Sequence, residues 1–581
     1  MKHETSAEGT PGGVMLNLYP DSLGGCLSRA AAFFARSEVK GAFSALYLLP
    51  SLFHSDLDRG FSVIDYDLEE TLATRSDLES IASGGVSLKL DFVLNHASVQ
   101  SPQFQHLVHY GEDSPYRDFF IDWNAFWQGK GAMTAQGFLQ PDEALIRDMF
   151  FRKPGLPILM VRFPDGSEHP YWNTFYQEIR YPRFTADEFA ALLDCTAEEA
   201  QKLAQSINAA LDHGKKPSEL DLAEPAKQRV AQALESRRNY LGQMDLNVSS
   251  PLVWAFYEET LKKLAGYGAK IVRLDAFAYA SKIAGRRNFF NEPETWLLLE
   301  RLRTLADESG ISLLPEIHAS YAEQTYKKIA QSGYMTYDFF LPGLLLDALE
   351  TGSGSLIRQW AEELSQNGIR TVNMLGCHDG IPLLDLRGLV PEERIETLIE
   401  TVVSRGGYVK NLYGQKNAYY QVNATYFSAL GESERRLLFC RAVQMFMPGI
   451  SQVWYLDLFA GKNDHEAVAR AGAGGHKEIN RTNLSNEQVS DGLRQPIVRR
   501  QLELLRFRNA FPAFGFDSEF EVTQTGEHAL TFVWKKNGYT ARLAADFSSA
   551  DFTAEGTDPE GNAAFAMRQN GREDETRSCN R

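Results

Sequence analysis

Eight short apolar runs alternate with helical stretches along most of the chain, and this rhythm constrains the fold more than any other feature. The runs are apolar throughout, as strands buried on both faces of a parallel sheet are. Helical segments between them, such as 293–310 and 356–368, end in Gly, which readily closes a helix. Eight such strands with intervening helices predict a (β/α)₈ barrel, and an open doubly wound sheet is the alternative. The runs are 15–19, 43–49, 86–94, 269–277, 311–317, 334–341, 371–376 and 451–458.

The spacing of these runs predicts where the barrel is interrupted and where it ends. About 175 residues separate the third and fourth runs, far more than an ordinary βα loop contains. A second long gap follows His378, and both gaps open at the carboxyl face of the predicted barrel. Near the C-terminus, alternating residues around Asn537-Gly538 predict a hairpin with a type I′ turn.

These breaks divide the chain into predicted domains. The barrel begins at 14–96, an inserted domain with a helical extension follows, and the barrel resumes before a second inserted loop region and a small antiparallel β domain. The remaining predicted segments are the insertion 97–240, barrel strands four to seven at 241–380, the inserted loops 381–430, the last strand and helices at 431–511, the C-terminal β domain 512–567 and a disordered tail 568–581.

Charge and cysteine content exclude several functional classes. The 59 Lys and Arg residues against 76 Asp and Glu residues give a net charge of −17. An acidic chain repels phosphate backbones and anionic membranes, so we expect neither nucleic acid nor membrane as a partner. No apolar run approaches the roughly 18–20 residues of a membrane span, and the N-terminus lacks a signal-peptide core. Five dispersed Cys residues without a CxxC pair indicate reduced thiols and predict a cytoplasmic protein.

Charged and polar side chains gather where four of the predicted strands end. Placing several charged groups in the apolar-walled mouth of the predicted barrel costs folding free energy unless the groups are paired or functional. One carboxyl group can stay ionised beside Arg273, while another has a raised pKa and keeps its proton. Cleavage of a glycosidic bond through a covalent glycosyl intermediate uses such a pair. The residues are Asp91, Asn95 and His96 after the third strand, Arg273 and Asp275 after the fourth, Glu316 and His318 after the fifth, and His378 and Asp379 after the seventh.

Four ordered motifs at these positions carry a family resemblance. LDFVLNH (90–96), RLDAF (273–277), LLPEIH (313–318) and CHDG (377–380) resemble the four sequence regions of the α-amylase clan, glycoside hydrolase family 13. The resemblance implies Asp275 as nucleophile, Glu316 as general acid/base and Asp379 as stabiliser of the transition state. It also implies that Arg273 orients Asp275, and that His96 and His378 bind hydroxyl groups of the glucosyl unit.

Within that clan the sequence is most similar to the sucrose phosphorylase subfamily. Similar segments include DRGFSVIDYD (58–67), QMDLN (243–247), HDGIPLLDL (378–386) and EINR (478–481). The resemblance implies that the calcium ligands usual in the clan are missing from this subfamily, so we expect neither a metal nor a cofactor. The resemblance implies that Asp58 and Arg481 clamp glucose, that Phe61 faces its ring, that Gln243, Tyr279 and His318 line the acceptor side, and that Arg152, Tyr420 and Gln421 approach the phosphate. Alternatively, His318 packs and orients Glu316, Arg152 pairs with the acidic insertion, and Tyr420 and Gln421 only complete the loop core.

The implied reaction converts an α-glucoside and inorganic phosphate reversibly into α-D-glucose 1-phosphate and an acceptor. The loop 413–421 contains Lys416 and no His, and Asn417-Ala418-Tyr419 suits a small neutral polyol. We therefore expect 2-O-α-glucosylglycerol as the substrate and glycerol as the acceptor. Sucrose 6′-phosphate and sucrose are the alternatives. The expected partners are these small molecules, and the chain is predicted to be a monomer or homodimer.

Two rival functions use the same barrel. A retaining α-glucosidase would pass the glucosyl group to water, so free glucose instead of glucose 1-phosphate would form. A binding protein with an inactive barrel would lack a catalytic carboxylate or carry a membrane anchor. The sequence holds all three carboxylates, Asp275, Glu316 and Asp379, which favours an enzyme.

Overall fold

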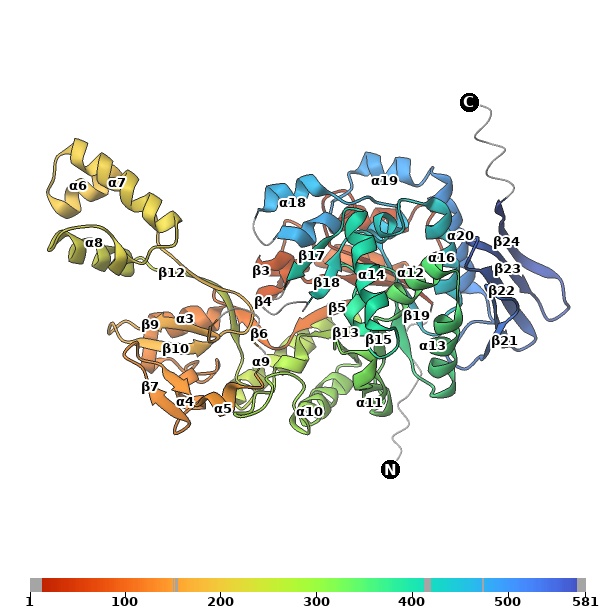
Figure 1. Cartoon of the computed structure of the whole chain (residues 1–581), viewed down its shortest axis with the longest axis horizontal. Coiled ribbons are helices and arrows are strands. Elements are labelled where there is room, and N and C mark those ends of the chain that lie inside the picture. Colours follow the sequence, from red (N-terminus) through yellow and green to blue (C-terminus); the bar gives the residue numbers. More distant parts are fainter. Residues whose placement is uncertain (1–12, 150, 152–154, 412–418, 473–474, 572–581) are drawn as a thin grey trace. The chain divides into compact units, whose positions relative to one another are not determined.

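The computed structural model of the chain describes residues 13–571 except 150, 152–154, 412–418 and 473–474. The chain divides into two compact units (Figure 1). The first unit comprises Met1–Asn95, Ile146–Pro154 and Val248–Arg581, and the second comprises His96–Leu145 and Gly155–Asn247. The short segment 146–154 therefore belongs to the first unit, although it interrupts the second in sequence. Within the described residues, no helix is both long enough and apolar enough to cross a bilayer.

The first unit is built on an eight-stranded sheet whose neighbouring strands are all parallel. Its order is β14-β13-β5-β2-β1-β19-β16-β15, so the two end strands are consecutive in this sheet's chain order. This is the nearly closed sheet of a (β/α)₈ barrel, and the predicted fold class is confirmed. The strands are β1 (Val14–Leu18), β2 (Ala45–Leu48), β5 (Ser87–Val93), β13 (Ala269–Asp275), β14 (Ser312–Pro315), β15 (Thr336–Asp338), β16 (Thr371–Asn373) and β19 (Ile450–Trp454).

Strand register brings charged residues together inside the barrel. Side chains two positions apart on a strand point to the same face, so Arg273 and Asp275 share one face of β13. Arg273 pairs in register with Asp91 on β5, which shares its own face with Lys89. Lys89 and Asp91 are fully buried, and Arg273 is 3% exposed. The barrel interior therefore contains a column of charged side chains below its carboxyl-terminal mouth.

Amphipathic helices cover the strands on the outside. Helix α13 (Ser355–Gln366) buries Ile357, Trp360, Ala361 and Leu364, the spacing of one helical face. Helix α12 (Leu341–Thr351) ends at Gly352, whose φ of 70° is a left-handed conformation that glycine adopts without strain. Further helices are α1 (Leu27–Phe34), α2 (Arg75–Ser83), α9 (Pro251–Gly266), α10 (Glu294–Glu308), α11 (Thr325–Gln331), α16 (Glu434–Phe446) and α20 (Pro496–Ala510).

The segment after β16 folds back over the mouth of the barrel. It contains the short helix η7 (Leu383–Leu386), helix α14 (Glu392–Ser404) and the antiparallel strands β17 (Tyr408–Asn411) and β18 (Tyr419–Asn423). Ile381 and Val422 exchange backbone hydrogen bonds of 2.9 and 3.1 Å. This bridge places β18 beside the loop that follows β16.

A five-stranded antiparallel sheet completes the first unit and confirms the predicted C-terminal β domain. Its strands are β20 (Glu519–Gln524), β21 (Ala529–Lys536), β22 (Tyr539–Asp546), β23 (Asp551–Thr557) and β24 (Ala563–Gln569). Asn537 and Gly538 have φ values of 50° and 83°, as a type I′ turn requires. Strand β24 runs two residues into the segment predicted as a disordered tail, and residues 572–581 lie outside the described part.

The second unit has its own strands and two small cores. Strands β11 (Gln177–Arg180), β12 (Asn239–Asp245) and β6 (His96–Ser98) form one sheet, and β9 (Ile158–Arg162) pairs with β10 (Glu168–Trp172). Trp123 and Trp127 are fully buried against Trp172, so they form a small hydrophobic cluster and are not open to a sugar. Helices α6 (Ala186–Leu193), α7 (Ala197–Asp212) and α8 (Ala226–Glu235) close over a separate core.

Candidate active site

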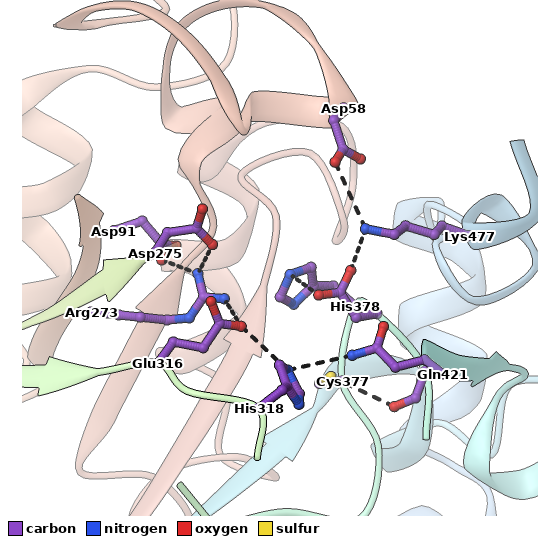
Figure 2. Close-up of polar contacts among 12 residues, drawn as sticks. Asp58, Asp91, Arg273, Asp275, Glu316, His318, Cys377, His378, Gln421 and Lys477 are labelled. Atoms are coloured by element: carbon purple, nitrogen blue, oxygen red, sulfur yellow. Dashed lines mark hydrogen bonds and ion pairs between the residues drawn. The ribbon is translucent and has the colours of Figure 1, made fainter. Parts of the chain in front are cut away.

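Arg273 is the centre of a dense charge network at the mouth of the barrel. One guanidinium nitrogen, Nη1, lies 2.6 Å from Asp91 and 2.9 Å from Asp275. The other, Nη2, lies 2.5 Å from Glu316. Asp275 and Glu316, here called the carboxylate pair, therefore meet across one guanidinium group (Figure 2). Two acidic side chains that are 41 positions apart in the chain are brought together, as the motifs at the strand ends predict.

The two carboxyl groups of the carboxylate pair differ in pKa. Burial and the neighbouring Glu316 raise the pKa of Asp275 well above its ordinary value, although Arg273 opposes this. Burial would also raise the pKa of Glu316, but Arg273 and His318 outweigh it and place that pKa below its ordinary value. The family resemblance implies an ionised Asp275 held by Arg273, and that role stays a prediction. The difference arises because Arg273 contacts both carboxylates, and His318 adds a second cation on the Glu316 side only.

His318 connects Glu316 to a further carboxylate. Its Nδ1 atom lies 2.9 Å from Asp385, and its Nε2 atom lies 3.6 Å from Glu316. Burial lowers the pKa of His318, but Asp385 and Glu316 outweigh burial and raise it to about 10. The ring stacks on Phe339 with centroids 4.0 Å apart. The Gln421 amide nitrogen lies 3.5 Å from Nε2, so Gln421 joins this group as well (Figure 2).

A second group, here called the lysine cluster, consists of Asp58, Asp379, Lys477 and Arg481. The Lys477 ammonium lies 2.7 Å from Asp379 and 3.7 Å from Asp58. Arg481 lies 3.5 Å from Asp379 and 3.6 Å from Asp58, and its Nε donates to the His378 carbonyl at 3.0 Å. Burial opposes ionisation of both acids, but Lys477 and Arg481 outweigh it, lowering the pKa of Asp58 and holding that of Asp379 well below its ordinary value. Both carboxylates in this cluster are therefore ionised.

His378 and Phe61 lie between these two groups. Their rings stack with centroids 5.0 Å apart and an interplanar angle of 11°. Burial, together with the cations Arg273, Arg481 and Lys477, lowers the pKa of His378 to about 3, although Asp379 acts in the opposite direction. His378 is therefore a neutral ring, able to donate or accept one hydrogen bond at a sugar hydroxyl.

Buried polar residues support the network from below. The Tyr47 hydroxyl donates to Asp91 at 2.9 Å, and Asp91 in turn contacts Arg273. The Lys89 ammonium lies 2.9 Å from the Gln452 side-chain oxygen and 3.7 Å from the Tyr47 ring centroid. Burial and Arg273 lower the pKa of Lys89 well below its ordinary value. These groups fix the guanidinium of Arg273, and hence both members of the carboxylate pair.

Cys377, which neighbours His378, is not an activated thiol. Burial raises its pKa to about 12, and Asp379 adds to the effect. Its thiol donates to the Gly380 carbonyl at 3.6 Å. The residue is therefore a buried, unreactive cysteine in the loop that follows β16.

The other predicted site residues lie in several places. Tyr279 ends the short helix η5 (Phe277–Tyr279) in the first unit, and its ring contacts Phe289 at 4.9 Å. His96 and Gln243 lie on neighbouring strands of the second unit, where both are buried. Their roles toward the barrel residues stay predictions. Arg152 lies outside the described residues, as does the side chain of Tyr420.

Three residues of the site carry no role in the sequence analysis. Asp385 lies inside the segment HDGIPLLDL, and Lys477 comes just before the segment EINR. Asp91 stands two positions from the apolar end of β5, on the same strand face as Lys89. A charged residue inside an otherwise apolar strand indicates a functional position, and this pattern identifies Asp91 in the sequence. Loop residues such as Asp385 and Lys477 give no such signal, because a loop conformation does not follow from periodicity.

A cavity of about 500 Å³ opens in the first unit beside the His318 loop. Ala319, which follows His318, lines it, and so does Phe289, the neighbour of Tyr279. Its charged lining residues are Asp148, Arg286, Arg287, Glu292 and Glu323. Arg287 lies 3.7 Å from Glu323 and is 56% exposed. The lining therefore carries charges of both signs, three acids and two arginines, beside the loop that contains His318.

Comparisons with known proteins place the chain in a family. It is 49% identical over 562 residues to a sucrose 6(F)-phosphate phosphorylase of Ilumatobacter coccineus, covering 95% of this chain and 97% of the relative. It is 27% identical over 542 residues to a glucosylglycerol phosphorylase of Marinobacter adhaerens, covering 92% and 94%. The crystal structure of sucrose 6F-phosphate phosphorylase from Thermoanaerobacter thermosaccharolyticum superposes with a TM-score of 0.79 at 30% identity, over 98% of this chain and 99% of that one. No family model matches the sequence.

Proposed function

Because the chain belongs to the sucrose phosphorylase subfamily of glycoside hydrolase family 13, and is a glucoside phosphorylase, we propose both its mechanism and its acceptor. The mechanism is a double displacement on the carboxylate pair, and the acceptor is fructose 6-phosphate, released from sucrose 6′-phosphate. The observation that carries the mechanism is the meeting of Asp275 and Glu316 across Arg273. The observation that carries the acceptor is the 49% identity to the Ilumatobacter enzyme.

In the first displacement Glu316 donates a proton to the glycosidic oxygen while Asp275 attacks the anomeric carbon. The bond from that carbon to oxygen breaks, the acceptor leaves, and a β-glucosyl ester forms on Asp275. In the second, a phosphate oxygen attacks the same carbon, the ester bond breaks, and Glu316 takes the proton that the phosphate loses. Two inversions yield α-glucose 1-phosphate with net retention.

We propose that the proton moves between the two carboxyl groups when substrate binds. In the free site Asp275 has the higher pKa and Glu316 the lower. A glycosidic oxygen seated against Glu316 separates that carboxylate from Arg273 and His318, which removes the two cations that favour its ionised form. The proton then passes to Glu316, and Arg273 remains to stabilise an ionised Asp275. Such a pair titrates as a unit, so its pH dependence belongs to both residues together.

We assign the lysine cluster and the stacked rings of Phe61 and His378 to the binding of the glucosyl unit. Asp58, Asp379 and Arg481 bind its hydroxyl groups, while Phe61 and His378 lie against the ring. Asp379 strengthens its hydrogen bonds as positive charge develops on the sugar. For the incoming phosphate, the described cations Arg273, Lys477 and Arg481 are all engaged with carboxylates. The phosphate therefore needs a further cation, for which Arg152 stays the proposal, and Gln421 and Tyr420 stay proposed phosphate contacts.

We propose fructose 6-phosphate as the acceptor in place of glycerol, which the loop sequence 413–421 favours. The identity to the glucosylglycerol phosphorylase is 27%, well below the 49% to the sucrose 6(F)-phosphate phosphorylase. Glycerol remains the second candidate, on the strength of the Marinobacter relative and the absence of His from the loop sequence.

A reverse-reaction screen tests the acceptor. The enzyme is given α-glucose 1-phosphate with fructose 6-phosphate, fructose, glycerol or glycerate, and phosphate release is followed. Charged hydrogen bonds to the acceptor phosphate predict a kcat/KM for fructose 6-phosphate about 10- to 100-fold above that for fructose. A preference for glycerol would contradict the proposed acceptor and leave the mechanism intact.

A forward assay tests the transfer step. With sucrose 6′-phosphate and inorganic phosphate, the product should be glucose 1-phosphate in amounts that match the fructose 6-phosphate released. Release of free glucose at the same rate without phosphate would identify a hydrolase.

A further inference from the structure

Lys477 occupies a position that none of the family motifs assigns. It lies on the short helix η8 (Gly475–Asn480), and its ammonium contacts Asp379 at 2.7 Å. The same ammonium lies 3.7 Å from Asp58 (Figure 2). Its contact with Asp379 is shorter than the 3.5 Å contact that Arg481 makes with the same oxygen. The Lys477 side chain is 28% exposed, so this ion pair is not a fully solvated surface pair.

The helix that carries Lys477 is tied to the loop that carries Asp379. The Asn480 side chain donates to the Cys377 carbonyl at 2.6 Å, and Arg481 donates to the His378 carbonyl at 3.0 Å. These bonds set the distance from the η8 backbone to Asp379. Asp58 comes from a different element, the turn η2 (Asp58–Gly60), where its φ is 47°. The structure thus uses one ammonium group to join carboxylates from two separate loops.

Two carboxylates that face one sugar repel each other unless a cation lies between them. Arg481 also contacts both, but at 3.5 and 3.6 Å, and its guanidinium is shared with Glu478 at 3.5 Å and with the His378 carbonyl. Lys477 has no such second engagement among its printed contacts in the described residues, which are Asp58 and Asp379. Lys477 therefore makes the shorter contact with Asp379, lies about as far from Asp58 as Arg481 does, and has no ion pair outside this pair of acids in the described residues.

We propose that Lys477 is a positioning residue of the glucose subsite, which holds Asp58 and Asp379 at the spacing that receives the glucosyl hydroxyl groups. This inference rests on the proposed function of Asp58 and Asp379. It concerns the glucosyl half of the substrate and is independent of the acceptor. Loss of Lys477 therefore impairs every glucosyl donor alike, whatever its leaving group.

The charged surroundings of Lys477 also fix the sign of its effect on pH dependence. Asp58, Asp379, His378, Arg481 and Glu478 form those surroundings. Burial opposes the charge on Lys477, but Asp379 and Asp58 outweigh it and raise the pKa of the lysine. In turn, Lys477 lowers the pKa of both acids against the effect of burial. Without Lys477 these acids protonate at higher pH, so the acid limb of kcat/KM moves upward.

The test compares Lys477→Met and Lys477→Arg with a matched control, Lys536→Met. Lys536 is 32% exposed and pairs with Asp517 at 2.8 Å in the C-terminal β domain, so it has similar exposure and a similar ion pair away from the site. Each variant is assayed with α-glucosyl fluoride, whose leaving group needs no proton, and with sucrose 6′-phosphate. Thermal unfolding is followed to show that each variant is folded.

We expect Lys477→Met to lower kcat/KM about 10- to 100-fold with both donors and to move its acid limb to higher pH. Lys477→Arg should recover most of the loss, and Lys536→Met should match the wild type. The inference is overturned if Lys477→Met behaves like Lys536→Met, if the loss is confined to one donor, or if the acid limb does not move. Failure of the proposed function is distinguishable, because the wild-type enzyme would then form no glucose 1-phosphate from sucrose 6′-phosphate and phosphate.

Discussion

The carboxylate pair and the lysine cluster each place two acids beside cationic side chains, yet the pKa values of the acids shift differently in the two groups. Asp275 and Glu316 share the guanidinium of Arg273, and one of them has a raised pKa while the other has a lowered one. In the lysine cluster, Lys477 and Arg481 both serve the carboxylates, and the pKa values of Asp58 and Asp379 are both lowered.

The ratio of cations to acids explains the difference. Where two cations meet two carboxylates, both acids are ionised and the group binds with fixed charge. Where one arginine is divided among Asp91, Asp275 and Glu316, a proton is retained and can move. We infer that the first arrangement suits recognition of sugar hydroxyls, and the second suits general acid–base chemistry.

The largest effects are expected when each member of the carboxylate pair is substituted in turn. Asp275→Asn removes the nucleophile and should lower kcat about 10⁴- to 10⁶-fold with every donor. Glu316→Gln removes the acid and should cost about 10²- to 10⁴-fold with sucrose 6′-phosphate. Only Glu316→Gln should recover its first step with α-glucosyl fluoride, measured as fluoride release. Equal recovery of both variants would contradict the division of roles.

A smaller effect is expected when a fixed charge is removed from the lysine cluster. Asp379→Asn keeps the shape of the side chain but loses the ionised oxygen that stabilises the developing positive charge. We expect kcat/KM to fall about 10²- to 10³-fold, with sucrose 6′-phosphate and α-glucosyl fluoride affected alike. A variant that is impaired only with sucrose 6′-phosphate would place Asp379 on the acceptor side instead.

The smallest expected effect is on the thermal stability of the protein, through the ion pair between His318 and Asp385. The pKa of His318 is raised from 6.5 to about 10, chiefly by Asp385 acting against burial. A raised pKa contributes stability that is fully present below pH 6.5 and is lost as the pH rises through 10.

Thermal unfolding should therefore occur at lower temperature as the pH is raised across that interval. Asp385→Asn should reduce this decline by lowering the midpoint mainly at the acid end of the interval, by a few degrees. The control is Asp517→Asn, whose partner Lys536 lies in the C-terminal domain. An identical pH dependence in wild type and Asp385→Asn would show that the His318–Asp385 pair does not stabilise the fold.

Much of the barrel could be predicted from the sequence because strand positions follow from periodicity, and the family resemblance then selects the carboxylates at the strand ends. The eight apolar runs correspond to the eight parallel strands, and alternation along β13 places Arg273 and Asp275 on one face. Motif order then brings Glu316 and Asp379 to the same mouth. These features depend on regular secondary structure, whose geometry is known before any tertiary contact is.

Lys477, Asp385 and the proton distribution could not be predicted in this way. Lys477 and Asp385 act from loops whose course depends on distant partners, such as the bridge between Ile381 and Val422. The pKa order of the carboxylate pair depends on which oxygen of each acid faces Arg273, and on the ring of His318. Such contacts follow from side-chain rotamers and burial, which residue type and spacing do not specify.

The most direct test of the central claim is to capture the glucosyl group on its nucleophile. Glu316→Gln is incubated with α-glucosyl fluoride in the absence of phosphate, digested, and examined by mass spectrometry. We predict one glucosyl group on the peptide that contains Asp275, and its release as α-glucose 1-phosphate when phosphate is added. A glucosyl group on any other residue, or phosphorolysis that yields the β anomer, would contradict a double displacement at Asp275 and Glu316.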